Sequence, residues 1–583
     1  MTRVVAVCFA VLVTASCVRA GFLDVCRTDE DCPPGHRCHN DTCVSDVGLP
    51  CSANSECAGA CIAGACASRA SAGEKCDPGE DADCQAACIC VSGRCRDDPC
   101  APPGVGADAS GRCLRTCKPA AEPDACASGA CYYIAATGGD DASPGTEPAK
   151  PWASFAHAWS VMQPGDTLIL LDGTFRTQLA PTVSGTAGAP ITIRAQNDGK
   201  AIIDGELARQ ACRFVKISHL EVQGIHCRNH RAAAVNTGLL FVGEASDITV
   251  RRVTVQESNG SCPLVHVYRS TNVLVEDCVA WGASDGVFVS YGSQRVTFRR
   301  CWAEMPASSP AGGYGSGVAL SRSSDCLVEN CVVVLPGAGA PSYDASAFPV
   351  HGGGTEPSSN NQLLGNVTLD FLGRWSFTLA SAGVRTEGNR FLNNVSINSG
   401  YGLFQRADAD LVVERHTAVG TSHTCHSLRA ASLVTYDSNF AIHGELTDSV
   451  FLGGETGFSL AEEAGILPTF THSHNVLSKV TTPYGNGTSA SPTEMVDTIE
   501  PTYDTATLGP GAYLVAPSNL ESAGSTGGPI GAEVLYHYEG AKLTCVPLWP
   551  WPMEQRILAE HGVSVTWAVK GGLWQTLDGV YPR

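Results

Sequence analysis

A short apolar pattern that returns along residues 215–475 constrains the fold more than any other feature of the chain. In the segment ITVRRVTV, apolar residues lie at offsets 0, 2, 5 and 7 from Ile248, and the polar Arg252 lies at offset 4. Ten copies of this pattern, some of them loose, begin 21–36 residues apart. They start at residues 215, 248, 273, 296, 326, 362, 390, 411, 444 and 471.

Each copy is predicted to be two short strands joined by a bend. Apolar residues at offsets 0 and 2 are typical of a strand, and the step from 2 to 5 changes the phase, which requires the chain to turn. Asn and Asp, which recur at offset 4, tolerate left-handed backbone. The residues at this offset are Arg252, Asp277, Arg300, Asn330, Asn366, Asn394, Arg415, Asp448 and Asn475.

Such a unit cannot bury its own apolar face, so the copies must stack on one another. The pattern predicts an all-β fold, a right-handed parallel β-helix in which each copy is one coil. The alternative is an all-β sandwich, whose strands also recur between turns. A sandwich, however, has no reason to repeat the residue at offset 4. The repeat resembles the pectin-lyase-like family of β-helices, which includes pectate lyases, polygalacturonases, alginate lyases and epimerases. The resemblance covers roughly residues 132–490. It implies the fold and does not by itself imply an activity, because one fold can carry many activities.

Residues 1–20 are predicted to be a signal peptide, with Arg3, the apolar run VVAVCFAVLV and small residues up to Ala20. The segment Thr14-Ala15-Ser16-Cys17 is similar to a bacterial lipoprotein box, which leaves a lipid anchor on Cys17 as the alternative. The apolar run is too short to span a membrane, and no later segment is long enough. We therefore expect a secreted, extracellular protein or one anchored by lipid to the cell envelope.

Residues 21–131 form a cysteine-rich module, with 18 cysteines between Cys26 and Cys131. An even number of cysteines with little apolar core predicts a disulfide framework. Zinc binding is the competing interpretation, but repeated C-x2-C pairs are missing. The segment DVCRTDEDCPPGHRCHNDTCV resembles small cysteine-rich repeats of secreted and surface proteins, which implies a stalk or an interaction module.

Residues 132–490 are predicted to be the β-helix, and residues 491–583 a C-terminal extension that packs on it. Trp152, Phe155 and Trp159 lie on one face of a short predicted helix that would cap the open N-terminal end of the solenoid. Nearby aspartates are interpreted as turn and cap residues. Three cysteines share offset 5 on consecutive coils and should stack in the core as small apolar residues, namely Cys278, Cys301 and Cys331.

The chain carries a formal net charge of −20, which disfavours nucleic acid and anionic membranes as partners. A polyanionic glycan would need bound Ca2+ or a local basic patch. No metal site is assigned, the sequence identifies no cofactor, and a monomer is expected.

Aromatic and basic side chains are predicted to face outward from the strands that precede each copy. Aromatic rings stack on sugars and arginine binds pairs of oxygens, so a polysaccharide is the expected partner. The candidate substrate-binding residues are Phe241, Tyr268, Arg269, Phe288, Phe404 and Arg406.

Two chemistries are open for such a surface. A lyase needs a base and a positive charge that neutralises the carboxylate of the substrate. The candidate catalytic residues for this reaction are His266 and His351 as the base, with Tyr343 as a further possibility, and Arg322 and Arg374 as neutralisers. A hydrolase needs paired carboxylates, for which Asp285, Asp344, Asp408 and Asp410 are present without a family motif. The alternative function is a non-catalytic surface protein for binding or adhesion.

Overall fold

The computed structural model describes residues 129–561 except for short gaps, together with the backbone of three hairpins upstream. The gaps are 206–209, 231–237, 258–262, 283–285, 307–314, 336–344, 372–374, 382–383, 407–408, 421–423, 430–442, 462–468, 486 and 550. The chain divides into two compact units, Met1–Thr116 and Cys117–Arg583. The predicted signal peptide and Cys17 lie outside the described residues.

Three antiparallel hairpins in the first unit share one arrangement. They pair β1 (His36–His39) with β2 (Thr42–Ser45), β3 (Ala60–Ile62) with β4 (Ala65–Ala67), and β5 (Cys88–Val91) with β6 (Arg94–Asp97). In each hairpin the register sets one cysteine opposite another: Cys38 and Cys43, Cys61 and Cys66, Cys90 and Cys95. The cysteine-rich module therefore repeats one small backbone unit.

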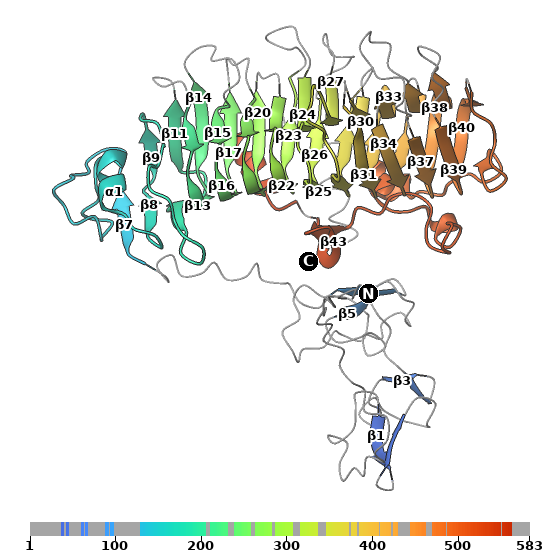
Figure 1. The fold of residues 1–583 in the computed structure, drawn as a ribbon, viewed down its shortest axis with the longest axis horizontal. Helices are drawn as coiled ribbons and strands as arrows, with labels where there is room; N and C mark the ends of the chain where they lie inside the picture. Colours follow the sequence, from blue (N-terminus) through green and yellow to red (C-terminus); the bar gives the residue numbers. More distant parts are fainter. Residues whose placement is uncertain are drawn as a thin grey trace, which may run out of the picture. The chain divides into compact units, whose positions relative to one another are not determined.

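The second unit is a right-handed parallel β-helix, as the repeat predicted (Figure 1). Each regular coil contributes one strand to each of three parallel stacks, which we call the first, second and third sheets. The first sheet has thirteen strands. They are β7 (Cys131–Ile134), β8 (Thr167–Leu170), β10 (Ile191–Ala195), β13 (Ser218–Gln223), β16 (Ser246–Arg251), β19 (Thr271–Glu276), β22 (Gln294–Arg299), β25 (Leu327–Glu329), β28 (Gln362–Leu364), β31 (Thr386–Leu392), β34 (Ala409–Glu414), β37 (His443–Thr447) and β39 (Thr469–Ser473).

The second and third sheets complete each coil. The second sheet contains β9 (Gly173–Phe175), β11 (Ala201–Gly205), β14 (His226–His230), β17 (Thr254–Glu257), β20 (Val279–Gly282), β23 (Trp302–Glu304), β26 (Val332–Val334), β29 (Val367–Leu369), β32 (Val395–Ile397), β35 (Thr417–Val419), the first half of β38 (Val450–Ala461), β40 (Val476–Tyr484) and β41 (Met495–Val496). The third sheet contains β12 (Cys212–Val215), β15 (Leu240–Gly243), β18 (Val265–Tyr268), β21 (Gly286–Tyr291), β24 (Gly315–Ser321), β27 (Ala345–His351), β30 (Trp375–Ala380), β33 (Tyr401–Arg406), β36 (Thr424–Arg429) and the second half of β38.

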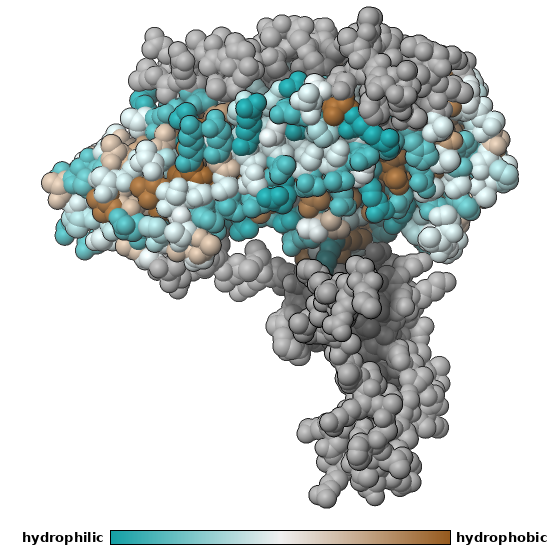
Figure 2. All heavy atoms as spheres, in the orientation of Figure 1, coloured by the Kyte–Doolittle hydropathy of each residue, from teal (hydrophilic) through white to brown (hydrophobic). Residues whose placement is uncertain are grey.

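The N-terminal end of the solenoid is capped by a short helix, as predicted. At the N-terminal end, helix α1 (Phe155–Val161) buries Phe155, and Trp152 lies beside it at 2% exposure. Asp141 accepts hydrogen bonds from the backbone of Ala153 and Ser154, so it is a turn residue as predicted. The surface turned toward the viewer in Figure 2 is mostly hydrophilic where it is coloured. In the described ranges the only large apolar side chain classed as exposed is Ile499.

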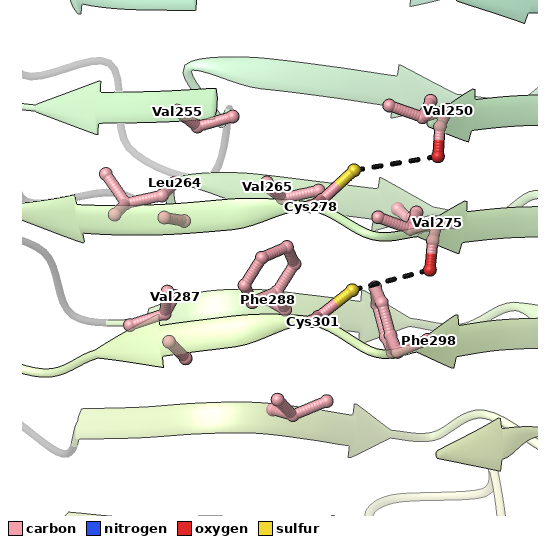
Figure 3. Close-up of a cluster of buried hydrophobic side chains, with 14 of the residues drawn as sticks. Val250, Val255, Leu264, Val265, Val275, Cys278, Val287, Phe288, Phe298 and Cys301 are labelled. Atoms are coloured by element: carbon pink, nitrogen blue, oxygen red, sulfur yellow. Dashed lines mark hydrogen bonds between the residues drawn. The ribbon is translucent and has the colours of Figure 1, made fainter. Parts of the chain in front are cut away.

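A column of inward side chains runs through the core at the turn between the first and second sheets. Cys278 and Cys301 lie one above the other, and their sulfur atoms approach the carbonyl oxygens of Val250 and Val275 at 3.6 and 3.4 Å (Figure 3). Burial raises the pKa of the Cys278 thiol to about 12, so this thiol is protonated and packs as an apolar group. The column includes Ile225, Val253, Cys278, Cys301, Cys331, Asn366, Asn394, His416, Ser449 and Asn475. The predicted stack of cysteines is confirmed.

The bend at offset 4 is left-handed in six of the nine predicted positions. These are Arg252, Asp277, Arg300, Asn330, Arg415 and Asp448, with φ between 48° and 54°. The prediction was wrong for Asn366, Asn394 and Asn475, because the left-handed residue there is one position earlier: Gly365, Asn393 and His474. Asparagine suits both a left-handed bend and the inward column, so residue type alone did not fix the register.

The chain after β41 runs back along the second sheet. Its elements are α2 (Thr505–Leu508), the 3₁₀ helices η4 (Gly509–Leu514) and η5 (Ser518–Leu520), β42 (Tyr536–Glu539), β43 (Lys542–Pro547) and α3 (Glu554–Glu560). Trp549 and Trp551, each 2% exposed, pack with Ile557 against Trp281 and Trp302 of the second sheet. This segment therefore covers the outer wall of that sheet. None of the helices in the described part of the chain is long and apolar enough to cross a bilayer.

Candidate functional site

The outer face of the first sheet is occupied by ion pairs within the protein. Glu276 forms ion pairs with Arg251, Arg299 and Arg300, at 2.7–3.0 Å between nitrogen and oxygen, and Arg299 also binds the fully buried Glu329 at 2.8 Å. Burial alone would raise the pKa of Glu276, but the three arginines lower it below the ordinary value for glutamate. These charges are used to hold the fold, and the second sheet is covered. The third sheet is therefore the wall that remains for a ligand.

Four ring-bearing side chains from three consecutive coils form the first aromatic cluster on this wall. Its members are Phe241, His266, Tyr268 and Tyr291. Tyr268 stacks on Tyr291 with centroids 5.8 Å apart and planes 14° apart, and it stacks on Phe241 at 6.2 Å. His266 meets Phe241 edge-on at 5.5 Å. Parallel pairing sets Tyr268 beside Tyr291, so the regular coil spacing builds the stack.

Two arginines lie over the tyrosines. The guanidinium carbon of Arg269 is 5.4 Å from the Tyr268 ring, and that of Arg322 is 5.2 Å from the Tyr291 ring. Both arginines occupy the left-handed turn that ends a strand of the third sheet, with φ of 46° and 50°. Arg322 also approaches Glu356, with 3.7 Å between nitrogen and oxygen. The rings hold the two cations at the surface by cation–π attraction.

Arg322 and His351 meet on adjacent coils. The backbone nitrogen of Arg322 donates to the carbonyl oxygen of His351 at 2.7 Å, and the His351 side chain is exposed. A Cβ atom added to Gly353 would lie 3.4 Å from Nε of Arg322 and 3.6 Å from Cε1 of His351. Both side chains therefore border the Gly353 position. We call Arg322 and His351 the polar centre.

A second aromatic cluster lies further along the same wall and consists of Trp375, Tyr401 and Phe404. Trp375 stacks on Phe404 with centroids 5.3 Å apart and planes 26° apart, and the Tyr401 ring lies 6.3 Å from Trp375. All three side chains are half-buried. Leu403, the neighbour of Phe404, is fully buried in the core, so Phe404 points outward, as predicted.

The prediction for Phe288 was wrong. This ring is 0% exposed and packs edge-on against Phe298 at 5.9 Å inside the solenoid (Figure 3). Phe288 pairs with the inward Val265, so the predicted phase of this strand was shifted by one residue. Val287 is fully buried as well, and a run of buried residues removes the alternation that sets the phase.

The remaining candidate residues divide into three groups. His266 is 5% exposed and serves the packing of the first aromatic cluster. Arg374 lies outside the described residues, as do the Arg406 side chain and Tyr343. Among the candidate carboxylates only Asp410 is described, and it binds Arg385 at 2.7 Å. In the described ranges, no group of three or more His, Cys, Asp or Glu residues is placed to hold a metal ion.

The substrate-binding and catalytic residues predicted from the sequence did not include Tyr291, Trp375, Tyr401 and Glu356. The sequence contains a feature that would have placed Tyr291. One serine on each of several successive coils accepts a hydrogen bond, through its hydroxyl, from a backbone nitrogen of the preceding coil. These serines therefore mark equivalent positions on successive coils. Ser270 accepts from Ala245, Ser293 from Ser270 and Ser323 from Ser293, at 3.0–3.2 Å. Aligning the sequence on these serines places Tyr268 beside Tyr291.

Comparison with known proteins gives one family match. The family model for chondroitinase B matches residues 153–239, and this match ends just before Phe241. The uncharacterized protein YwoF of Bacillus subtilis strain 168 is 28% identical over 131 residues, and the match covers 21% of this chain and 27% of that protein.

Several solved structures are similar in fold. The lacto-N-biosidase of family GH136 from Eubacterium ramulus is 15% identical over 63% of this chain and 67% of its own, with a TM-score of 0.40. XylC in complex with xylose is 9% identical over 64% and 87%, with a TM-score of 0.42. Pectate lyase Pel9A is 14% identical over 72% and 96%, with a TM-score of 0.33.

Proposed function

We propose that this protein binds an acidic polysaccharide outside the cell on the outer face of the third sheet and cleaves it by β-elimination at the polar centre. The observation that carries the proposal is the Tyr268–Tyr291 stack with Arg269 and Arg322 over its rings. Tyrosine faces stack on the apolar faces of sugars, and guanidinium groups bind carboxylates or sulfates through paired hydrogen bonds. The match to the chondroitinase B family model supports the same class of substrate.

Arg269 and Arg322 allow an acidic sugar to bind despite the negative net charge of the chain. A chain with a net charge of −20 repels a polyanion at long range. Screening confines that repulsion to about 8–10 Å at physiological salt, so two arginines held at the surface can attract an acidic sugar that lies against them. Held as they are over tyrosine rings, Arg269 and Arg322 supply the local basic patch.

The proposed reaction uses two side chains of the polar centre. Arg322 pairs with the uronate carboxylate and makes the proton on the adjacent carbon more acidic. Neutral His351 takes that proton, and the electrons of the carbon–hydrogen bond form a carbon–carbon double bond. The glycosidic oxygen leaves with the electrons of its own bond and takes a proton from water. The products are one shortened chain and one chain with an unsaturated end.

Secretion is part of the proposal. The disulfide between Cys212 and Cys227 joins β12 to β14, and Cys131 at the start of β7 is also disulfide-bonded. Disulfides persist in oxidising compartments. Together with the predicted signal peptide, they support a location outside the cytosol.

The test is to incubate the purified full chain with chondroitin sulfate, dermatan sulfate, alginate and polygalacturonate, with and without added Ca2+. Ultraviolet absorbance of unsaturated ends and release of reducing ends are followed together, and affinity gels report binding. We expect binding to one of these polymers and unsaturated products from it. Binding without products would support the alternative of a non-catalytic surface protein. Absence of both for every polymer would overturn the proposal.

A further inference from the structure

The second aromatic cluster lies on the same wall as the first, on the far side of the polar centre. Parallel pairing carries the third sheet from β15 through β18, β21, β24, β27 and β30 to β33 without a break. Phe241, Tyr268 and Tyr291 lie on the first three of these strands. Arg322 follows β24, and His351 ends β27. Trp375 and Phe404 lie on the last two. The polar centre therefore has aromatic rings on both sides.

The two clusters together span a length of the wall that is long compared with a single sugar unit. Strands in a sheet lie about 4.8 Å apart, so the six steps from β15 to β33 span roughly 29 Å along the solenoid. A ligand that touches both clusters must be a chain of several sugars that crosses the strands obliquely, because Trp375 pairs with Ser346, at the start of β27, and His351 is at its end. A ligand held by the first cluster alone would reach the polar centre with only one of its ends.

We propose that Trp375, Tyr401 and Phe404 form a second sugar-binding position for the same polysaccharide, so that the polymer crosses the polar centre and is cut within its length. This inference rests on the proposed function. The half-buried indole of Trp375, held against the Phe404 ring, offers one flat face of fixed orientation. A pyranose stacks its apolar face on such a ring, and the ring stack lowers the cost of ordering the indole.

The experiment measures how affinity depends on the length of the oligosaccharide. The probes are size-fractionated oligosaccharides, from disaccharide to decasaccharide, of alginate and of dermatan sulfate, with calorimetry on the full chain. The variants are Trp375→Ala, Phe404→Ala and Tyr291→Ala, and Trp375→Phe is the conservative control. We expect Trp375→Ala to weaken binding of the decasaccharide about fivefold or more and to leave binding of the shortest bound oligosaccharide unchanged. Trp375→Phe should restore most of the loss.

Product length gives an independent readout. Early products from the unmodified protein should be long oligosaccharides, and Trp375→Ala should shift them toward release of short units from chain ends. If Trp375→Ala and Phe404→Ala bind and cut as the unmodified protein does while Tyr291→Ala is impaired, the second position is refuted and the proposed function stands. If the unmodified protein neither binds nor cuts any probe, the proposed function itself fails. Circular dichroism and thermal unfolding of each variant separate loss of binding from loss of folding.

Discussion

Asn366 lies directly over Asn394 inside the solenoid, and its backbone and side-chain nitrogens both donate to Oδ1 of Asn394, at 2.9 and 3.0 Å. Asn366 in turn accepts from the backbone nitrogen of Cys331 at 2.8 Å, and its side chain donates to the carbonyl oxygen of Val328 at 2.9 Å. The side chains thus bond the turns of neighbouring coils to one another, in a core where an unpaired polar group is costly.

Replacing Asn366 by Ala should destabilise the β-helix strongly. The change leaves the buried backbone nitrogen of Cys331 without the Asn366 side chain, at about 1–3 kcal/mol, and removes one of the bonds to the carbonyl oxygen of Val328. Urea unfolding followed by circular dichroism would measure the loss. The control is Asn398→Ala, because Asn398 is bonded at an exposed position to Asp370. Equal midpoints for the two variants would contradict the role of the column.

The stability of the protein should fall in acid partly because of His416. Burial lowers the pKa of this side chain to about 3, so it is neutral in the folded protein at every pH above that value. In the unfolded chain its pKa is about 6.5. Between these values the unfolded chain binds the extra proton, so stability rises with pH across this window by up to about 1.4 kcal/mol per pH unit. His416→Asn extends the asparagine column and should flatten this dependence. A thermal-unfolding series from pH 4 to pH 8 would test this, and an unchanged slope in the variant would refute the assignment.

Arg322→Ala should abolish most of the cleavage that the proposed function assigns to the polar centre. Removing a positive charge aimed at a developing anion costs about 10²–10³ in kcat. Arg390→Ala is the matched control, since Arg390 is half exposed on the first sheet and binds Glu414 there. Steady-state kinetics on the polymer found to be cleaved would compare the two. Near-normal kcat in Arg322→Ala would remove this residue from the mechanism.

His351→Ala should lower kcat by about 10²–10⁴ if this side chain is the base. The remaining activity should lose the limb of the pH profile that reports His351, while affinity for the polymer in gels stays close to normal. His266→Ala is the comparison, because His266 is buried in the first aromatic cluster and should affect binding and stability in preference to the pH profile. If the pH profile changes in His266→Ala and not in His351→Ala, His266 is the base and His351 is not.

Arg556→Ala should loosen the C-terminal segment. Arg556 donates to the backbone carbonyl oxygens of Ile225, at 3.0 Å, and of Arg252, which lie on early coils. Loss of these bonds removes two ties between α3 and the early coils, while the carbonyl oxygen of Ile225 keeps its bond from the backbone nitrogen of Thr254. Limited proteolysis should cut the variant near α3 faster than the unmodified chain, and dye binding should report the exposed tryptophan wall. Equal cleavage rates would show that the aromatic packing alone holds the segment.

The repeat predicted the fold because each coil must bury the same face, and that demand recurs in every copy. The stack of Cys278, Cys301 and Cys331 followed from it directly. The predictions for Phe288 and for three asparagine bends failed because each placed the chain one residue out of register. In a strand, such a shift moves every side chain to the opposite face. Trp375 and Tyr401 could not be placed by an alignment of serines, because the aligned hydroxyl on the coil of Trp375 belongs to Thr386, which does not follow its strand as closely as Ser270 and Ser293 follow theirs.

The return of the C-terminal segment along the second sheet has a consequence for biosynthesis. In a solenoid each coil touches only its neighbours, so coils can assemble in the order in which they leave the ribosome. Trp281 and Trp302, however, stay uncovered until Trp549 and Trp551 emerge, some 250 residues later. Throughout that interval the nascent chain exposes an apolar, aggregation-prone surface on its second sheet. We expect it to depend on a holdase chaperone until the C-terminal segment has been synthesised.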